Sequence, residues 1–335
     1  MIKKIIMKNI LNRLINHEVL TKQEAKDILV NISNGSYNNS QIAAFLTVYM
    51  MRSITVEELE GFRDALLELC VAVDLSEYNP IDLCGTGGDG KDTFNISTLS
   101  SFVAAGAGIK VTKHGNYGVS STCGSSNVME HLGIKFSNNK DFLTKSIEET
   151  GICVLHAPLF HPAMKNVAPI RRELAVKTFF NMLGPMVNPA FPTNQMVGVF
   201  NLELARMYGY LYQNGTKNFT ILHALDGYDE ISLTGKTKTI TRNTEAMLTP
   251  DDFGVAPLQQ SDIYGGDSIE SSAKIFVDVL SGKGTEAQNN VVCANSGMAI
   301  ATVQNLTPKE GFEKAKESLL SGKGLEVLKK LKSLS

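Results

Sequence analysis

A glycine-rich segment, IDLCGTGGDGKDTFNIST at residues 81–98, is the part of the sequence best suited to chemistry. A predicted strand leads into a turn that contains Gly85, Gly87 and Gly88, and a helix is predicted to begin near Asn95 to Thr98. Backbone amides of such a turn, together with the free amides of a helix N-terminus, bind phosphate groups well. Because glycine has no side chain, it lets the backbone come close to the anion. The segment therefore predicts a phosphate-binding loop.

Two common nucleotide-binding motifs nearly fit this loop, and both fail on chemistry. Gly85, Gly87 and Gly90 satisfy the GxGxxG pattern of dinucleotide-binding folds. Those folds place an acidic residue about 20 positions later, whereas here the next strand, IKVTK, ends in Lys113. The loop also satisfies GxxxxGK of the nucleotide P-loop, but Asp92 stands where a hydroxyl should bind magnesium.

Asp89 lies inside the loop, where a carboxylate would repel a bare phosphate. It is explained by a ligand that carries hydroxyl groups or metal ions beside its phosphates. Phosphoribosyl pyrophosphate carries ribose hydroxyls, phosphate groups and bound magnesium. Asn95, Ser97 and Thr98 would add amide and hydroxyl groups at the start of the following helix, where one of them can serve as the N-cap.

Further motifs follow in order: KHGN at 113–116, HPAMKNVAPIRRELAVKTFFNMLGPMVNP at 161–189 and DGYDEIS at 226–232. Together with GTGGD and NIST, they resemble the anthranilate phosphoribosyltransferase family over essentially the whole chain. The resemblance implies transfer of the 5-phosphoribosyl group from phosphoribosyl pyrophosphate to the amine of anthranilate. The products would be N-(5-phosphoribosyl)anthranilate and pyrophosphate, in tryptophan biosynthesis. It also implies a homodimer formed through the helical domains, and catalysis in a cleft between the helical and α/β domains.

Position by position, the resemblance assigns residues to three ligands, with Mg²⁺ as the cofactor. The residues assigned to magnesium are Ser97, Asp229 and Glu230. Those for anthranilate are Gly85, Asn116 and Arg171. Those for the sugar-phosphate are Gly85, Gly88, Asp89, Thr93, Asn95, Ile96, Ser97, Thr98, Lys113, His114, Gly115, Asn116, Tyr117, Gly118, Val119, Ser120, Ser121 and Ser125. Whether His114 contacts the substrate or only shapes the loop stays open.

The residue types suit these roles. Lys113 is a point charge at the end of a strand, which suits a phosphate. Asp229 and Glu230 follow a long apolar strand, and carboxylate oxygens suit magnesium. Arg171 can form a forked pair with the carboxylate of anthranilate, and we assign its neighbour Arg172 to the surface.

The sequence departs from the family pattern at several positions. After KHGN the family most often has Arg, whereas this chain has Tyr117, and GSSN replaces the common GSAD at Ser126 and Asn127. Ala175 and Lys177 replace a usual Gly and Arg. The first three departures adjoin the ligand loop, so they affect the contacts expected there.

The surrounding elements predict two domains, which is also what the chain length favours. Residues 1–72 show only helical patterns, with capping boxes at Thr21–Glu24 and Thr55–Glu58, and SQIAAFLTVYMM is expected to be a strongly buried helix. This helical domain would be completed by helices near 165–187.

From residue 80 onward, apolar runs such as IDLC, IKVT, ICVLHA, MVGVF and FTILHAL alternate with helix-length segments. This alternation predicts an α/β fold, with a central, mostly parallel sheet of the nucleoside phosphorylase and phosphoribosyltransferase type. Residues 73–335 would form the domain that binds phosphoribosyl pyrophosphate. Its last segment, SGKGLEVLKKLKSL, is expected to form an amphipathic helix packed on the domain.

Composition narrows the class of protein. The 335 residues are 43% hydrophobic and 20% charged, with a net charge of -2, which gives no general attraction to nucleic acid or to an anionic membrane. No apolar run reaches the roughly 18 residues of a membrane span. The five scattered cysteines form no CxxC pair, which favours reduced thiols in a cytoplasmic protein.

The reaction sets the expected mechanism. Pyrophosphate leaves with developing charge, so metal and amide donors aimed at it lower the barrier. The amine of anthranilate is largely unprotonated at neutral pH, so we expect no general base. One alternative is a pyrimidine nucleoside phosphorylase, but its KHSTGG-type loop is missing. Another is a non-catalytic nucleic-acid-binding relative, which the acidic balance and the intact DGYDE oppose.

Overall fold

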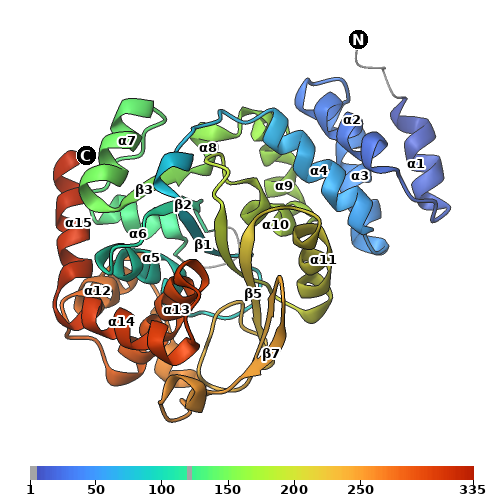
Figure 1. Ribbon diagram of the computed structural model, residues 1–335. Coiled ribbons are helices and arrows are strands. Elements are labelled where there is room, and N and C mark those ends of the chain that lie inside the picture. The colour runs from blue at the N-terminus through green and yellow to red at the C-terminus, as the bar shows by residue number, and fades with distance from the viewer. Residues whose placement is uncertain (1–5, 119–122) are drawn as a thin grey trace. The chain divides into compact units, whose positions relative to one another are not determined.

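The structure is a computed structural model that describes residues 6–118 and 123–335. The chain folds into two compact units. The helical unit comprises residues 1–72 and 157–189, and the α/β unit comprises residues 73–156 and 190–335 (Figure 1).

The N-terminal part of the helical unit consists of α1 (Met7–Ile15), α2 (Lys22–Ser33), α3 (Asn39–Met51) and α4 (Val56–Glu68). The predicted capping boxes at Thr21–Glu24 and Thr55–Glu58 are confirmed as the starts of α2 and α4. Asn38 forms a further box with Gln41 at the start of α3. The prediction that this third helix is strongly buried was wrong at its end: Met50 is 44% exposed and Met51 80%.

The second segment of this unit is helical but repeatedly interrupted. It consists of α8 (Ala157–Phe160), η2 (Pro162–Asn166), α9 (Ala168–Leu174), α10 (Phe180–Leu183) and η3 (Gly184–Val187). Proline occupies the first or second position of η2, α9 and η3, where its missing N–H costs nothing. Phe179 stacks on Phe62 at 4.4 Å and meets Phe45 and Tyr49 edge-on. These aromatic contacts join the two segments into one core.

The α/β unit is built on a sheet that has seven strands within the described residues, in the order β3-β2-β1-β4-β5-β6-β7. The strands are β1 (Ile81–Gly85), β2 (Val111–Gly115), β3 (Ile152–His156), β4 (Asn194–Gly198), β5 (Asn218–Ala224), β6 (Thr237–Thr241) and β7 (Glu245–Leu248). The first five run parallel, as the alternating pattern predicts. The antiparallel β6 and β7, which complete the mostly parallel sheet, were not foreseen.

Helices and short turns complete this unit. They are η1 (Ser76–Tyr78), α5 (Ile96–Gly106), α6 (Ser125–His131), α7 (Lys140–Thr150), α11 (Leu202–Gln213), η4 (Pro250–Phe253), η5 (Gln260–Ile263), α12 (Ile269–Leu280), α13 (Glu286–Gln304), α14 (Pro308–Leu320) and α15 (Lys323–Leu334). The last helix packs against α5 and α7, as expected. No helix among the described residues is long and apolar enough to cross a membrane.

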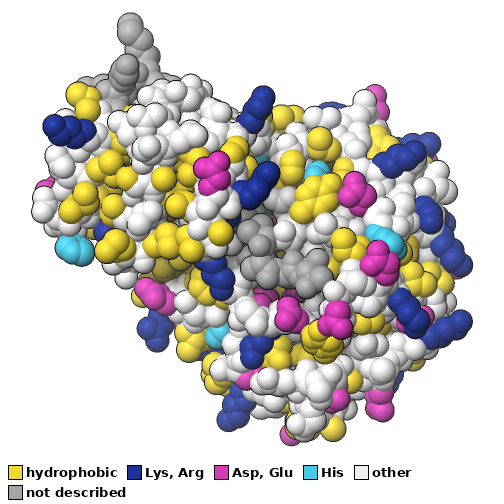
Figure 2. Space-filling model, turned by 180° about the vertical axis from the view of Figure 1, so that it is seen from behind, with side chains coloured by type: hydrophobic (Ala, Val, Ile, Leu, Met, Phe, Trp, Pro, Cys, Tyr) yellow, Lys and Arg dark blue, Asp and Glu magenta, His cyan; other side chains and the backbone are white. Residues whose placement is uncertain are grey.

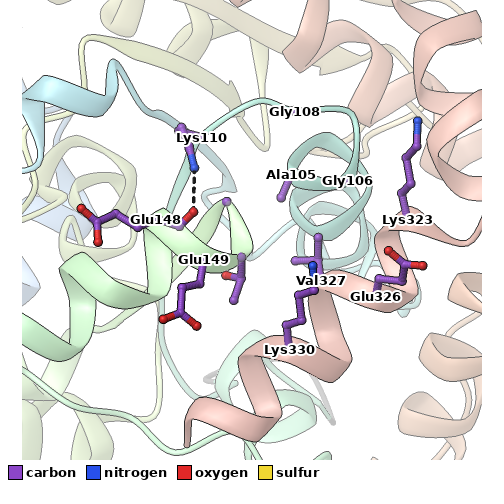
Figure 3. Close-up of a pocket in the computed structure, with 12 residues that line it drawn as sticks. Ala105, Gly106, Gly108, Lys110, Glu148, Glu149, Lys323, Glu326, Val327 and Lys330 are labelled. Atoms are coloured by element: carbon purple, nitrogen blue, oxygen red, sulfur yellow. Dashed lines mark hydrogen bonds between the residues drawn. The ribbon is translucent and has the colours of Figure 1, made fainter.

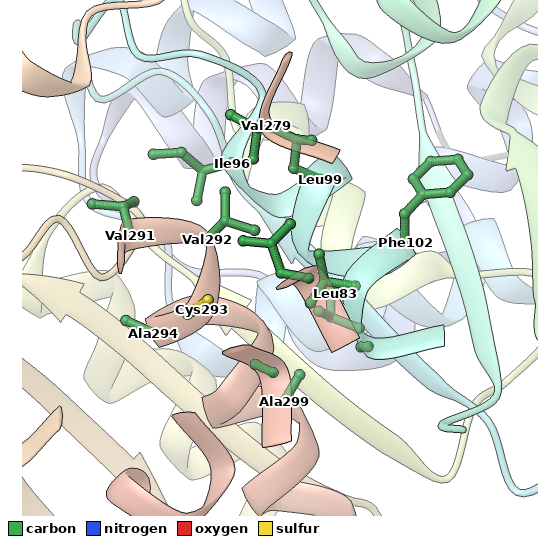
Figure 4. Close-up of a cluster of buried hydrophobic side chains, with 14 of the residues drawn as sticks. Leu83, Ile96, Leu99, Phe102, Val279, Val291, Val292, Cys293, Ala294 and Ala299 are labelled. Carbon is green, nitrogen blue, oxygen red and sulfur yellow. The ribbon is translucent and has the colours of Figure 1, made fainter. Parts of the chain in front are cut away.

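The core of the α/β unit fixes α5, the helix that follows the glycine loop. Leu99 and Phe102 of this helix are fully buried with Leu83 of β1 and Val292 of α13 (Figure 4). Phe102 also meets Phe276 of α12 edge-on at 5.6 Å. The N-terminus of α5 is therefore held at the end of β1 by close packing.

Candidate active site

The predicted phosphate loop begins where β1 ends. Gly87, Gly88 and Gly90 have φ angles of 65°, 75° and 73°, in the left-handed region that favours glycine. The amide of Gly87 donates a hydrogen bond to Oδ2 of Asp229 at 2.7 Å. The amide of Lys91 donates to Oδ1 of Asp89 at 3.1 Å, which closes the turn. The loop is thus linked directly to the DGYDE segment, 142 residues further along the chain.

Two strand ends must be glycine because Asp229 lies against them. A Cβ on Gly198, the last residue of β4, would lie 1.5 Å from the backbone oxygen of Asp229. A Cβ on Gly85 would lie 2.3 Å from Oδ2 of the same residue. Gly85 was predicted as a site residue, whereas Gly198 was missed. Its only signal in the sequence was a glycine within the apolar run MVGVF.

Asp229 and Glu230 are both buried, with 7% and 8% of their surface exposed. Burial raises the pKa of Asp229 well above its usual range, and the charges of Glu230 and Asp89 raise it further. Burial also raises the pKa of Glu230, while the nearby cation of Lys113 opposes this shift. Ser97 donates to Glu230 from its backbone amide and its hydroxyl. The structure therefore concentrates negative charge beside the glycine loop.

Lys113 lies inside this cluster, with only 2% of its surface exposed. Its Nζ donates to the backbone oxygen of Leu83 at 2.6 Å and to Oγ of Ser97 at 3.4 Å. The buried ammonium group thus joins β1, β2 and the start of α5. The structure brings together Ser97, Lys113 and Glu230, which lie far apart in the sequence.

The start of α5 differs from a simple capped helix. Asn95 is the N-cap residue, but its side chain makes no capping hydrogen bond. Instead, Nδ2 donates to the backbone oxygen of Cys123 at 2.9 Å. Thr93 pairs with Tyr264 in an isolated β-bridge, and the side chains of Ile96 and Thr98 are buried.

The KHGN segment forms the end of β2 and the loop after it. The amide of His114 donates to Oδ1 of the fully buried Asp82 at 3.3 Å. A Cβ on Gly115 would lie 2.4 Å from Oγ of Ser125, and that hydroxyl donates to the backbone oxygen of Asn116 at 3.2 Å. Residues 114–116 are therefore held by backbone and hydroxyl contacts.

The departure at Asn127 has a structural explanation. Its Oδ1 accepts hydrogen bonds from the amides of Gly118 and Gly124, at 2.9 and 3.1 Å. The two glycines lie so close that a Cβ on Gly124 would be 2.1 Å from the amide nitrogen of Gly118. An asparagine oxygen accepts these two bonds as an aspartate would, but without adding a negative charge. The predicted residues Val119, Ser120 and Ser121 lie outside the described residues.

Asn295 of α13 is a positioning residue that the sequence did not reveal. It is fully buried, accepts from the amide of Ile231 at 3.0 Å and donates to the backbone oxygen of Ile231 at 2.9 Å. Ile231 directly follows Glu230, so this paired contact fixes the backbone after the carboxylates. Nothing distinguishes Asn295 in the sequence from other asparagines in helices.

Arg171, predicted to bind anthranilate, lies on α9 of the helical unit. Its Nη2 donates to Oδ1 of Asn181 at 3.2 Å, and its Cζ lies 5.3 Å from the ring centroid of Phe180. Burial lowers the pKa of its guanidinium. No carboxylate forms an ion pair with it within the described part of the chain. Arg172 is exposed, as expected.

Ala175 and Lys177, the two departures from the family pattern after α9, lie in different structural settings. Ala175 has a φ of 52° at the left-handed C-cap, a conformation that a glycine adopts at lower cost. Lys177 is exposed, and nothing in the structure explains why it replaces Arg.

A charged pocket lies elsewhere in the α/β unit, between the ends of α5 and α7 and the start of α15 (Figure 3). Lys110, Glu148 and Lys330 are among the residues that line it, and none of the predicted ligand-binding residues does. Nζ of Lys110 donates to the backbone oxygens of Ile147 and Glu148, at the C-terminal end of α7. This lysine therefore stabilises a helix end.

Comparisons with known proteins agree with this architecture. A family described as the helical bundle domain of a glycosyl transferase family matches residues 8–70, and one described as the a/b domain of that family matches residues 77–325. An anthranilate phosphoribosyltransferase from Flavobacterium psychrophilum is 79% identical over 98% of this chain and 100% of its own length. One from Bacteroides thetaiotaomicron is 54% identical over 98% of this chain and 99% of its own.

Solved structures with a similar fold are also anthranilate phosphoribosyltransferases. Anthranilate phosphoribosyltransferase from Thermus thermophilus has a TM-score of 0.90 at 30% identity and covers 97% of this chain and 98% of its own. The enzyme from Saccharomyces cerevisiae, in complex with PRPP and Mg, has a TM-score of 0.91 at 28% identity, over 99% of this chain and 98% of its own.

The helical bundle, the α/β unit and its glycine loop beside buried carboxylates define a two-domain glycosyltransferase. Within that class, the identity to the Flavobacterium and Bacteroides proteins is specific and spans almost the whole chain. The chain belongs to the anthranilate phosphoribosyltransferase family.

Proposed function

We propose that the α/β unit binds phosphoribosyl pyrophosphate and that the chain transfers the 5-phosphoribosyl group to the amine of anthranilate. The contact between Gly87 and Asp229 supports this most directly, because it places a phosphate-type loop beside buried carboxylates. The Saccharomyces cerevisiae relative was solved with PRPP and Mg, and also with 4-fluoroanthranilate. The products are N-(5-phosphoribosyl)anthranilate and pyrophosphate.

Ser97, Asp229 and Glu230 fit a magnesium ion. The site offers two buried carboxylates and a hydroxyl that contacts one of them, and these are the hard oxygen ligands that magnesium prefers. The raised pKa values of both carboxylates show that the nearby positive charge of the chain does not balance their negative charge. Among the described residues, no group of three or more acidic, histidine or cysteine side chains forms a complete metal cage. Oxygens of the ligand and water would therefore complete the coordination. When bound, the ion would neutralise charge on the departing pyrophosphate.

The chain's own groups would bind and orient the sugar-phosphate. The glycine loop exposes backbone amides, and α5 begins at Ile96, after its N-cap Asn95, next to that loop. Lys113 contributes a buried positive charge that offsets Glu230. The residues from His114 to Ser121, and Ser125, belong to the proposed site as the resemblance assigns them. The described ones among them are fixed at Asn116 and Gly118 by backbone contacts.

Arg171 is the residue that we propose for the carboxylate of anthranilate. It is partly buried, carries no intramolecular ion pair within the described residues and is oriented by Asn181 and Phe180. A planar guanidinium held in this way can form two parallel hydrogen bonds with a carboxylate. Gly85 and Asn116 are proposed to contact the same substrate.

We assign no general base. The aromatic amine of anthranilate is already unprotonated at neutral pH, so its lone pair is available for the anomeric carbon. Catalysis then depends on holding the two substrates in line and on stabilising the charge of the leaving group.

We also propose that the chain forms a homodimer through its helical unit and acts in the cytoplasm. Hydrophobic side chains gather on the surface of this unit (Figure 2). The exposed hydrophobic side chains of this unit are, among others, Ile15 of α1, which is 62% exposed, and Met50 and Met51 of α3. Such exposed apolar groups favour a protein interface. All five cysteines are free thiols, which suits a reducing compartment.

The test is an assay of anthranilate fluorescence. We expect fluorescence to fall only when phosphoribosyl pyrophosphate and magnesium are both present, with release of one pyrophosphate per anthranilate consumed. Phosphorolysis of thymidine or uridine without such a reaction would favour a nucleoside phosphorylase and contradict the proposal.

A further inference from the structure

His156 is the last residue of β3 and lies in register with Gly115, the last residue of β2. Its side chain is buried. Its ring stacks on Phe136 at 4.5 Å, and Tyr117 meets it edge-on at 4.8 Å. Its Nδ1 lies 2.8 Å from Oγ of the fully buried Ser126. The imidazole is therefore fixed by two rings and one hydrogen bond.

The residues that contact this ring also hold Asn116. The amide of Ser126 donates to the backbone oxygen of Asn116 at 3.1 Å. The amide of Tyr117 donates to Oδ1 of Asn116 at 2.8 Å. His156 thus contacts two of the residues that hold the proposed ligand residue Asn116, and the hydroxyl of Ser125 is a third contact.

The chemistry of the ring suits a neutral positioning group. Burial lowers the pKa of His156, and the charge of the exposed Glu130 only partly opposes this shift. A neutral imidazole shares one hydrogen bond with the hydroxyl of Ser126 and adds no charge next to the ligand loop. Tyr117 and Ser126 are two of the three positions near the loop where this chain departs from the family pattern, and both contact this one ring.

We propose that His156 is a positioning residue for phosphoribosyl pyrophosphate, acting through Ser126 and Tyr117 on Asn116. This inference rests on the proposed function. A ring that only filled space would contribute to stability but not to affinity for the ligand. The hydrogen bond between His156 and Ser126 is the part of the cluster that distinguishes the two roles.

The test uses full-length His156→Phe, Ser126→Ala and the double variant. Phenylalanine keeps an aromatic ring between Phe136 and Tyr117 but removes the hydrogen bond. Binding of phosphoribosyl pyrophosphate with magnesium is measured by calorimetry, and the two Michaelis constants are measured separately. Each single variant is expected to weaken sugar-phosphate binding by several-fold, up to about tenfold, as loss of one hydrogen bond allows. The Michaelis constant for anthranilate should rise as well, because Asn116 is proposed to contact both substrates.

The double variant decides whether the two residues act together. If they share one contact, it binds the sugar-phosphate no more weakly than either single variant. His156→Asn, whose side-chain amide can reach the position of Nδ1, should recover most of the binding. The matched control is Ser146→Ala, because Ser146 is equally buried but bonds only within α7.

Sugar-phosphate binding by Ser126→Ala equal to that of the unsubstituted protein would overturn the positioning role, even if its thermal stability fell. The positioning role would also be overturned if the fold-loss of sugar-phosphate binding in the double variant equalled the product of the losses in the two single variants. If His156→Phe does not fold, Ser126→Ala alone carries the test. An unsubstituted protein that neither binds nor consumes phosphoribosyl pyrophosphate would instead show that the proposed function is wrong.

Discussion

Each unit of the molecule buries carboxylates, and the two units treat them differently. In the helical unit, the fully buried Glu58 accepts from the amides of Leu20 and Thr55 and from the hydroxyl of Tyr49. It also forms an ion pair with Arg52, whose side chain is 7% exposed. Burying this charge is tolerated because the chain itself supplies the cation and the donors.

In the α/β unit, burial and the charge of Asp89 raise the pKa of Asp229 and that of Glu230, and the cation of Lys113 partly offsets the shift at Glu230. Their raised pKa values show that the folded chain holds them in an environment unfavourable to negative charge. A buried charge that the chain itself neutralises needs no ligand from outside, whereas an excess of buried negative charge indicates a site for an external cation. Glu58 is thus a structural acid, in contrast to Asp229 and Glu230, the pair proposed to bind magnesium.

Neutralising Asp229 and Glu230, the proposed metal-binding pair, should have the largest effect. We expect Asp229→Asn with Glu230→Gln to abolish metal-dependent turnover, while the metal-free protein stays folded and is at least as stable as before. The side chains keep their size but no longer repel each other or attract a cation. Titrating magnesium against activity, and against the melting temperature with phosphoribosyl pyrophosphate present, checks both parts.

The matched control for this double variant is Glu148→Gln with Glu149→Gln, an adjacent acidic pair that is exposed on α7. Its magnesium dependence should be unchanged. Full activity and an unshifted magnesium curve for the Asp229 and Glu230 variant would remove the pair from the metal site.

Removing the structural acid should cost stability instead. Glu58→Ala leaves the buried Arg52 without its ion-pair partner, so we expect the free energy of unfolding in urea to fall by about 3–5 kcal/mol. The control is Glu24→Ala, because Glu24 also closes a capping box and pairs with an arginine, Arg13, but at a partly exposed position. This control variant should lower the free energy of unfolding by about 1 kcal/mol. Equal costs for the two variants would show that burial of the ion pair is not what matters.

The two arginines of the helical unit extend the comparison, since Arg52 has an internal acid and Arg171 has none among the described residues. Arg171→Ala should raise the Michaelis constant for anthranilate by about one to two orders of magnitude, or roughly 1.5–3 kcal/mol. The constant for phosphoribosyl pyrophosphate should change little. Arg172→Ala, at the exposed neighbouring position, should leave both constants near normal. If Arg171→Ala raised the Michaelis constants for both substrates equally, Arg171 would not be the residue that binds the carboxylate.

Local patterns were enough to predict the elements that depend on neighbouring residues. The capping boxes at Thr21 and Thr55, the glycine loop and the parallel strands each have a signal within a few positions of sequence. The pairing of β6 with β7 was missed because short polar strands such as TKTIT carry no clear apolar alternation.

Long-range contacts account for what sequence reasoning missed at the site. Gly198 is required only because Asp229 packs on it, and Asn295 matters only because α13 passes beside Ile231. His156 acquires its contacts from α6 and from the loop after β2. None of these relations has a fixed spacing along the chain, so single-sequence reasoning could name the ligand residues by resemblance but not their supports.

Two helices end in the left-handed conformation with different residues, and exchanging these residues should have the smallest effect. Helix α7 ends at Gly151 with a φ of 80°, whereas α9 ends at Ala175 with a φ of 52°. Glycine adopts this left-handed conformation freely, while alanine is strained there by about 1–2 kcal/mol. Glycine also makes the unfolded chain more flexible, which offsets about 0.4–1 kcal/mol of that gain. Ala175→Gly should therefore raise the free energy of unfolding in urea by about 0.5–1 kcal/mol, and the reverse change, Gly151→Ala, should lower it by a similar amount. A loss of stability in Ala175→Gly would mean that the end of α9 does not hold alanine under strain.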